Sequence, residues 1–177
     1  VHSVDYFIRL GERLAEMGSQ IICLKDMAGL LSPQVTYDIV KGLKSRISLP
    51  VHVHTHCTSG MAYMSYLKAV EAGTDILDTA LSPLSQGTSQ PATEAMVAAL
   101  RDTPFDTGLD LKPLKEIADY FYEVRGKYAE FESPINNRVN AEILISQIPG
   151  GMLSNLVAQL RQQKAEDKMD ALFSEVP

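Results

Sequence analysis

The sequence predicts an α/β fold built on a parallel sheet, followed by an α-helical segment. Three observations lead to this prediction. Amphipathic stretches alternate with short apolar runs from residue 3 to residue 101, which is the pattern of repeated strand–helix units. Each apolar run is followed by a loop rich in polar residues, whereas the turns that lead into the runs are short. Beyond residue 102 the apolar runs stop and only helical periodicity remains.

The first three elements are predicted as helix, strand and helix. Apolar side chains recur at helical spacing over 3–17, between Ser3 as a plausible N-cap and Gly18 as a plausible stop. The isoleucine-containing run over 21–24 indicates a buried strand. A Ser-Pro pair then suits the N-cap and first position of a helix over about 33–45. The side chains predicted to be buried in this helix are Val35, Ile39, Val40 and Leu43.

The next four elements continue the alternation. A strand is predicted over 51–56, a helix over 59–73 that closes on a glycine, a strand over 76–81, and a helix over 91–101 that begins with a proline. Two methionines of the helix over 59–73, Met61 and Met64, are predicted to be core residues.

The second part of the chain is predicted to be helical. One helix is expected over 110–130, with one apolar side formed by Leu114, Ile117, Phe121 and Val124. A polar turn over 133–140 and a Pro-Gly-Gly turn precede a last amphipathic helix. We therefore divide the chain into residues 1–102, the last βα units of a barrel, and residues 103–177, an incomplete helical extension.

The polar βα loops favour a TIM (β/α)₈ barrel, in which the working face lies at the carboxyl ends of the strands. Three such loops carry distinctive sequences: KDMAG, HTHCTSG and SPLSQGTSQP. Three strands cannot close a barrel, so the sheet is either open or the C-terminal part of a barrel. The chain also has no initiator methionine and opens directly on a helix, so it is expected to be a fragment.

Composition limits the classes of function. The formal net charge is -6 and the Lys and Arg residues form no long run, which argues against nucleic acid as the main ligand. Two cysteines, Cys23 and Cys57, indicate a reducing, cytoplasmic location and not a disulfide scaffold. Cys57 is predicted to be a small packed residue and not a nucleophile. No apolar run is long enough to cross a bilayer.

Three of the four histidines alternate along one predicted strand, VHVHTH. Side chains at every second position share one face, so His52, His54 and His56 point together while the valines pack on helices. Two ring nitrogens at positions i and i+2 can converge on one divalent ion, and His54 and His56 are nearest the mouth. His52 lies deeper. The alternative is an ordinary polar strand without a metal.

Lys25 ends the preceding strand, so the same mouth receives its side chain. A lysine ammonium has only donors and cannot bind a metal ion. Carboxylation by CO₂ would turn it into a carbamate with two acceptor oxygens. The alternative is an ion pair between Lys25 and the adjacent Asp26.

Four ordered motifs, LKDMAGLLSP, HVHTHCTSGM, DTALSPLSQGTSQPATEAMV and QIPGGMLSNL, resemble the biotin-dependent carboxyltransferase family, and the resemblance extends to about residue 165. The family includes the carboxyltransferase parts of pyruvate carboxylases, the oxaloacetate decarboxylase alpha subunit and the large subunit of transcarboxylase. The resemblance implies that Lys25 is a carbamylated metal ligand and that His54 and His56 are the metal-binding histidines. The implied ion is zinc, manganese or cobalt. An aspartate ligand and a substrate arginine would lie upstream, and a proton-shuttling threonine beyond Pro177.

The resemblance also implies a reaction: transfer of a carboxyl group between carboxybiotin and pyruvate or oxaloacetate, with the metal as Lewis acid. The implied partners are a biotin carboxyl carrier domain and further copies in a homo-oligomer, with membrane subunits only through a complex. Within the chain, Lys25 and Thr88 are the candidate catalytic residues. The candidate cofactor-binding residues, whose side chains would hold biotin or a carboxylate, are Ser85, Gln86 and Ser89. A competing interpretation is that Ser89 and Gln90 cap the helix that Pro91 begins.

Two other functions remain open. Metal-dependent lyases and synthases of the hydroxymethylglutaryl-CoA lyase and isopropylmalate synthase type also carry a His-x-His strand, but have no lysine at the position of Lys25. A non-catalytic scaffold that binds the biotin carrier is the third possibility.

Overall fold

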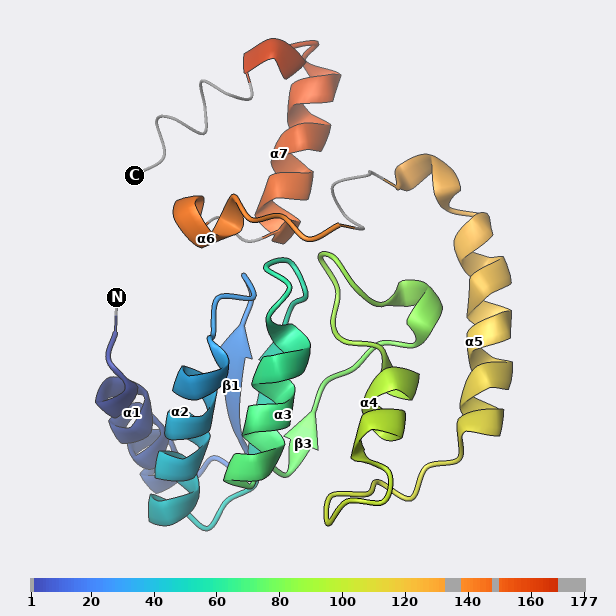
Figure 1. Ribbon diagram of the computed structural model, residues 1–177. Coiled ribbons are helices and arrows are strands. Elements are labelled where there is room, and N and C mark those ends of the chain that lie inside the picture. Colours follow the sequence, from blue (N-terminus) through green and yellow to red (C-terminus); the bar gives the residue numbers. More distant parts are fainter. Residues whose placement is uncertain (1, 133–137, 148–149, 169–177) are drawn as a thin grey trace.

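The computed structural model describes residues 2–132, 138–147 and 150–168 (Figure 1). The elements of the first part are α1 (Val4–Glu16), β1 (Ile22–Asp26), α2 (Pro33–Arg46), β2 (Val51–Thr55), α3 (Ala62–Ala72), β3 (Ile76–Leu77), η1 (Ser82–Leu84) and α4 (Thr93–Leu100). The second part contains α5 (Leu111–Gly126), η2 (Ala129–Phe131), α6 (Ile143–Ser146), α7 (Gly150–Gln162) and η4 (Glu166–Lys168). The predicted α/β class and the helical character of the second part are confirmed. No described helix is long and apolar enough to span a membrane.

The three strands form one parallel sheet in the order β1-β2-β3. Lys25 pairs in register with His54, and His52 pairs with Ile76. Since all strands run the same way, their carboxyl ends meet at one edge, and the three predicted loops lie there together. The edge is at the top of the sheet in Figure 1.

The third strand is shorter than the predicted 76–81, and the fourth helix starts later than predicted. Both differences have one cause. The Ala80 N–H donates to the Pro91 carbonyl, and the Thr93 N–H donates to the Ala80 carbonyl. This isolated parallel bridge between Ala80 and Ala92 keeps the chain extended through residue 92. Pro91 therefore precedes the helix instead of starting it.

One face of the sheet is covered by helices and forms the core. Val51 and Val53 have no exposed surface, and Ile22 and Leu24 of β1 pack in the same cluster with side chains of α2 and α3. Burial of each such aliphatic side chain contributes about 1.5–3 kcal/mol. The opposite face carries Cys23, Lys25 and the histidines, and these side chains are exposed or half-buried.

The helix caps are as predicted. The Ser3 hydroxyl accepts from the Tyr6 N–H, and the Ser32 hydroxyl accepts from the Val35 N–H with Pro33 in the first turn. Gly73 ends α3 in the left-handed conformation, with φ 99°.

Three predicted core residues are wrong. Val35 is 37% exposed, Met64 55% and Ile117 45%. In each helix the buried stripe runs at a slightly different angle from the predicted one. In α2 it follows Thr36, Ile39, Val40 and Leu43, and in α3 it follows Ala62, Ser65, Tyr66, Ala69 and Val70. In α5 the buried residue is Ala118. Neighbouring positions differ by about 100° around a helix, so a shift of one residue moves a side chain off the core.

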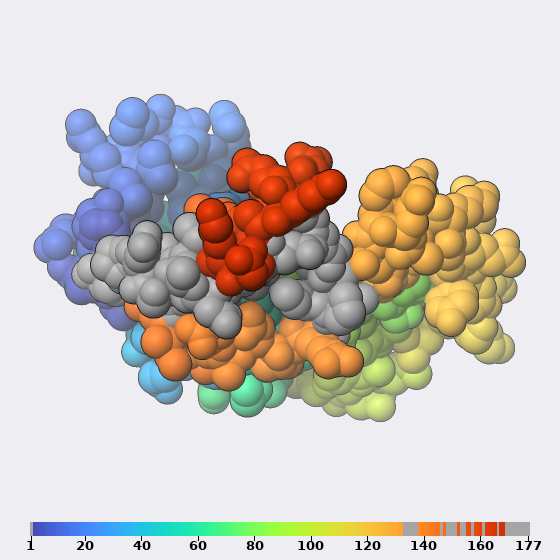
Figure 2. All heavy atoms as spheres, turned by 90° about the horizontal axis from the view of Figure 1, so that it is seen from above, coloured from blue at the N-terminus to red at the C-terminus, as the bar shows by residue number. Residues whose placement is uncertain are grey.

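The second part of the chain returns to the carboxyl edge of the sheet. The Asn140 N–H donates to the Thr58 carbonyl at 2.8 Å. A Cβ atom added to Gly60 would lie 3.3 Å from Val139, so the two segments touch. Seen from above, residues 138–147 (orange) lie over this edge (Figure 2). The predicted Pro-Gly-Gly turn is wrong for its glycines, because α7 begins at Gly150. Pro149 and residues 133–137 of the predicted polar turn lie outside the described residues.

Candidate functional site

The carboxyl edge of the sheet brings two predicted site residues onto neighbouring strands. Lys25 on β1 and His54 on β2 are register partners on the open face of the sheet. Lys25 is exposed and forms no ion pair with any described residue. The alternative prediction of a Lys25–Asp26 pair is therefore wrong. Adjacent residues of a strand point to opposite faces, and Asp26 faces the helices.

Asp26 organises the loop instead. It is 8% exposed, and its carboxylate accepts from the backbone N–H groups of Leu30 at 3.0 Å and Leu31 at 2.8 Å. It also accepts from the Ala28 N–H at 3.3 Å and from the Thr55 hydroxyl at 2.8 Å. One buried carboxylate therefore shapes the loop after β1 and ties it to the end of β2. This holds Lys25 and the histidine strand in a constant relation.

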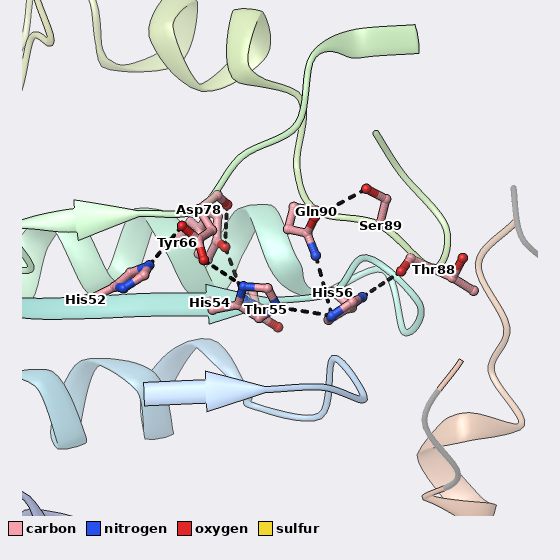
Figure 3. A network of polar contacts seen from close by, with 9 residues as sticks. All are labelled: His52, His54, Thr55, His56, Tyr66, Asp78, Thr88, Ser89 and Gln90. Carbon is pink, nitrogen blue, oxygen red and sulfur yellow. Dashed lines mark hydrogen bonds and ion pairs between the residues drawn. The ribbon is translucent and has the colours of Figure 1, made fainter. Parts of the chain in front are cut away.

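His54 and His56 have their ring nitrogens assigned by their neighbours (Figure 3). Nδ1 of His54 lies 2.7 Å from the Asp78 carboxylate, and Nδ1 of His56 lies 2.6 Å from the Thr88 carbonyl. Carboxylates and carbonyls only accept, so both Nδ1 atoms carry the proton. In the neutral rings both Nε2 atoms then carry lone pairs, and these two atoms are 3.1 Å apart.

Two lone pairs at this distance repel each other unless a proton or a cation lies between them. A divalent ion bound at about 2.0–2.1 Å from each nitrogen would place the two nitrogens roughly 2.9–3.4 Å apart. The observed separation of 3.1 Å therefore fits joint ligation. The histidines also have the hydrogen-bond partners that metal-ligating imidazoles usually have, a carboxylate and a backbone carbonyl. Among the described residues, no group of three or more His, Cys, Asp or Glu side chains is placed to hold a metal ion.

Asp78 is a site residue that the sequence analysis missed. Its Oδ2 accepts from His54, and its Oδ1 lies 2.9 Å from Nε2 of His52 without hydrogen-bond alignment. Burial by itself would raise the pKa of Asp78, but the contacts with His54 and His52 outweigh burial and lower the pKa below its usual value. The available signal was its spacing: Asp78 follows Ile76 by two residues, so it continues the open face of β3.

The loop over 82–90 places its predicted residues in different surroundings. The Thr88 carbonyl orients His56, so Thr88 acts on the imidazole pair through its backbone. Ser85 is buried and its hydroxyl donates to the Ser82 carbonyl at 3.0 Å. The Gln86 amide donates to the Tyr63 hydroxyl. Together with Ser89, these residues line a cavity of about 400 Å³ against α5 and η2, to one side of the imidazole pair.

Ser89 does not cap a helix, which contradicts the competing prediction. The N-cap of α4 is Ala92, with no side-chain bond. The Ser89 hydroxyl donates to the side-chain oxygen of Gln90 at 3.3 Å, and the Ser89 carbonyl accepts from the Cys57 N–H at 2.8 Å. Gln90 was not predicted as a site residue, yet its Nε2 lies 3.4 Å from Nε2 of His56.

Comparison with known proteins identifies the family. Residues 2–121 match the HMGL-like family model. The chain belongs to the HMGL-like family. Residues 143–177 of this family member also match a conserved carboxylase domain model. The predicted relationship to the biotin-dependent carboxyltransferases is confirmed by named relatives.

Two relatives and one solved structure illustrate this. The chain is 56% identical over its whole length to 31% of a pyruvate carboxylase subunit of Methanocaldococcus jannaschii. It is 45% identical over its whole length to 35% of the methylmalonyl-CoA carboxyltransferase 5S subunit of Propionibacterium freudenreichii. The carboxyl transferase domain of Rhizobium etli pyruvate carboxylase with pyruvate and biocytin matches with a TM-score of 0.90 and 39% identity, covering 96% of this chain and 28% of that one. The chain thus spans about a third of these relatives.

In this HMGL-like chain, Cys57 is a packed residue, as predicted. It is 3% exposed, and burial raises the pKa of its thiol to about 11. Since the thiolate is the nucleophilic form, Cys57 is protonated and inert at neutral pH.

Replacing Gly29 with alanine is expected to disturb the contact between the first two loops. Gly29 has φ +71°, and an added Cβ would lie 2.4 Å from the His56 carbonyl oxygen. Gly18 is a matched control, with φ +96° and no atom within 4 Å of an added Cβ. We expect Gly18→Ala to cost about 1 kcal/mol from backbone strain alone, and Gly29→Ala at least about 2 kcal/mol. Thermal unfolding of the two variants measures the difference, and equal losses would show that the His56 carbonyl yields easily.

Proposed function

We propose that this chain supplies part of the metal site of a biotin-dependent carboxyltransferase, which moves a carboxyl group between carboxybiotin and pyruvate or oxaloacetate. The observation that carries the proposal is the pair of Nε2 lone pairs, 3.1 Å apart on His54 and His56, with both Nδ1 protons committed elsewhere. The names of the relatives support the reaction, since they are a pyruvate carboxylase subunit and a methylmalonyl-CoA carboxyltransferase subunit. The three parallel strands would be the last strands of a (β/α)₈ barrel.

In this proposal His54, His56 and carbamylated Lys25 are ligands of a zinc, manganese or cobalt ion. A bound divalent ion supplies a positive charge that polarises the carbonyl group of a keto acid. The chain's own residues hold the ligands in place. Asp78 and the Thr88 carbonyl orient the two rings, and Asp26 holds the loop beside Lys25.

The loop over 82–90 has a different proposed task. Ser85, Gln86 and Ser89 line the 400 Å³ cavity beside the imidazole pair, where they would shape the site that receives biotin. Thr88 stays the candidate catalytic residue of this loop. Residues 1–102 would form the barrel part and 103–177 the helical extension. The partner would be a biotin carboxyl carrier domain, and the assembled enzyme would be a cytoplasmic homo-oligomer that meets membrane subunits only within a complex.

A lyase or synthase of the hydroxymethylglutaryl-CoA type is the second candidate, because the HMGL-like model covers residues 2–121 without distinguishing the two. The presence of Lys25 and the carboxylase-domain match over 143–177 favour the carboxyltransferase. A non-catalytic carrier-binding scaffold would not require the paired imidazoles.

Metal content of the full-length protein tests the proposal. We expect Lys25→Ala and His54→Ala each to lose the metal, and Lys41→Ala, an exposed lysine of α2, to retain it. Added acetate should return part of the metal to Lys25→Ala, because its carboxylate offers the two acceptor oxygens of the carbamate. If only His54→Ala loses metal, the lyase or synthase assignment is favoured. A wild-type protein that binds no divalent metal would overturn the proposal.

A further inference from the structure

Asp78 touches two histidines of the open face, one through each carboxylate oxygen. Resting on the proposed function, we propose that Asp78 is a positioning residue: it holds His54 in the one tautomer that leaves Nε2 free to bind the metal, and so prevents His54 and His56 from blocking each other by hydrogen bonding.

The first support for this proposal is that Asp78 is held in place from both sides. Its backbone N–H donates to the Val53 carbonyl at 3.2 Å, and its carbonyl accepts from the Tyr66 hydroxyl at 2.6 Å. Tyr66 is fully buried and also accepts from the Thr55 N–H at 3.1 Å. The carboxylate therefore projects from a backbone that is fixed to β2, the strand that carries the histidines.

The second support is that both oxygens have a histidine partner. Oδ2 lies 2.7 Å from Nδ1 of His54, and Oδ1 lies 2.9 Å from Nε2 of His52 (Figure 3). An ionised carboxylate is only an acceptor, so it demands a proton on Nδ1 of His54. His52, one layer deeper on β2, occupies the other oxygen and limits rotation of the carboxylate.

The third support comes from the alternative tautomer. A neutral imidazole can carry its proton on either nitrogen. With the proton on Nε2, His54 would donate to the lone pair of His56 across 3.1 Å. That bond would satisfy both rings and close the position between them to a cation. Asp78 removes this option because a proton on Nε2 would leave the carboxylate facing the lone pair of Nδ1.

The test compares metal affinity in the full-length protein, using Co²⁺ in competition with a chromophoric chelator. Asp78→Asn keeps the shape but presents either an amide donor or a single carbonyl to His54. We expect Co²⁺ affinity to fall 10- to 100-fold, the usual effect of losing such a partner. Activity should return towards the wild-type kcat at saturating Co²⁺, which a folding defect would not allow.

Asp75→Asn is the matched control. Asp75 lies just before β3 and accepts from Lys44 and from the Val51 N–H, on the side of the sheet away from the imidazole pair. Its variant should bind Co²⁺ as the wild type does. If Asp78→Asn does not fold, Asp78→Ser replaces it, because serine also removes the charge and is smaller.

The outcomes separate the two proposals. If the wild type binds Co²⁺ and the Asp78 variant binds it equally well, the role of Asp78 is overturned while the proposed function stands. If the wild type binds no Co²⁺, the proposed function fails and the role of Asp78 fails with it. An equal loss of affinity in the Asp75 variant would also overturn a specific role for Asp78.

Discussion

His56→Ala is expected to remove carboxyl transfer from the full-length protein almost completely. The substitution deletes one of the two facing Nε2 atoms and the bond from Nδ1 to the Thr88 carbonyl. The site then loses a ligand and the anchor of the loop over 82–90. A Lewis-acid contribution of several kcal/mol corresponds to a loss of about 100-fold or more in kcat.

Metal content and kcat measured on the same preparation check this result. His52→Ala is the matched control, because His52 lies on the same face of β2 but one layer deeper than the His54–His56 pair. It should retain metal and most of the activity. A His56→Ala protein that keeps both metal and rate would remove the imidazole pair from the mechanism, whatever the family relationship.

Asp26→Ala is expected to destabilise the carboxyl edge of the sheet. Four donors lose their acceptor: the N–H groups of Ala28, Leu30 and Leu31, and the Thr55 hydroxyl. The carboxylate is 8% exposed and Thr55 1% exposed, so water replaces these bonds poorly. At about 1–3 kcal/mol for each buried group left without a partner, we expect a total loss of about 3–5 kcal/mol.

Hydrogen–deuterium exchange and thermal unfolding of the full-length protein check this prediction. Exchange of peptides that cover residues 26–31 should rise strongly. Asp38→Ala is the matched control, since Asp38 lies towards the surface of α2 and accepts an exposed bond from Gln34. Its effect should stay within about 0.5 kcal/mol. Equal effects of the two substitutions would mean that Asp26 does not organise the loop.

Local patterns were sufficient to predict most of the elements. Ser3, Ser32 and Gly73 mark helix ends through contacts within a few residues, so their roles can be seen in the sequence. The alternation of valine and histidine in β2 likewise predicts which side chains share a face. The end of β3 and the start of α4 could not be predicted this way, because the bridge between Ala80 and Ala92 joins segments that are separated by a whole loop.

The sequence by itself determined the α/β class, the common face of the histidines, and the family to which the chain is related. Those features follow from short-range periodicity and from ordered motifs. Only the tertiary structure decided that Asp26 turns away from Lys25 towards Thr55, that Asp78 contacts His52 and His54, and that the Thr88 carbonyl orients His56. The partners in these contacts come from different strands and loops and are 24 to 32 positions apart. Their meeting depends on the parallel register of the sheet, which packing of the whole sheet against its helices determines.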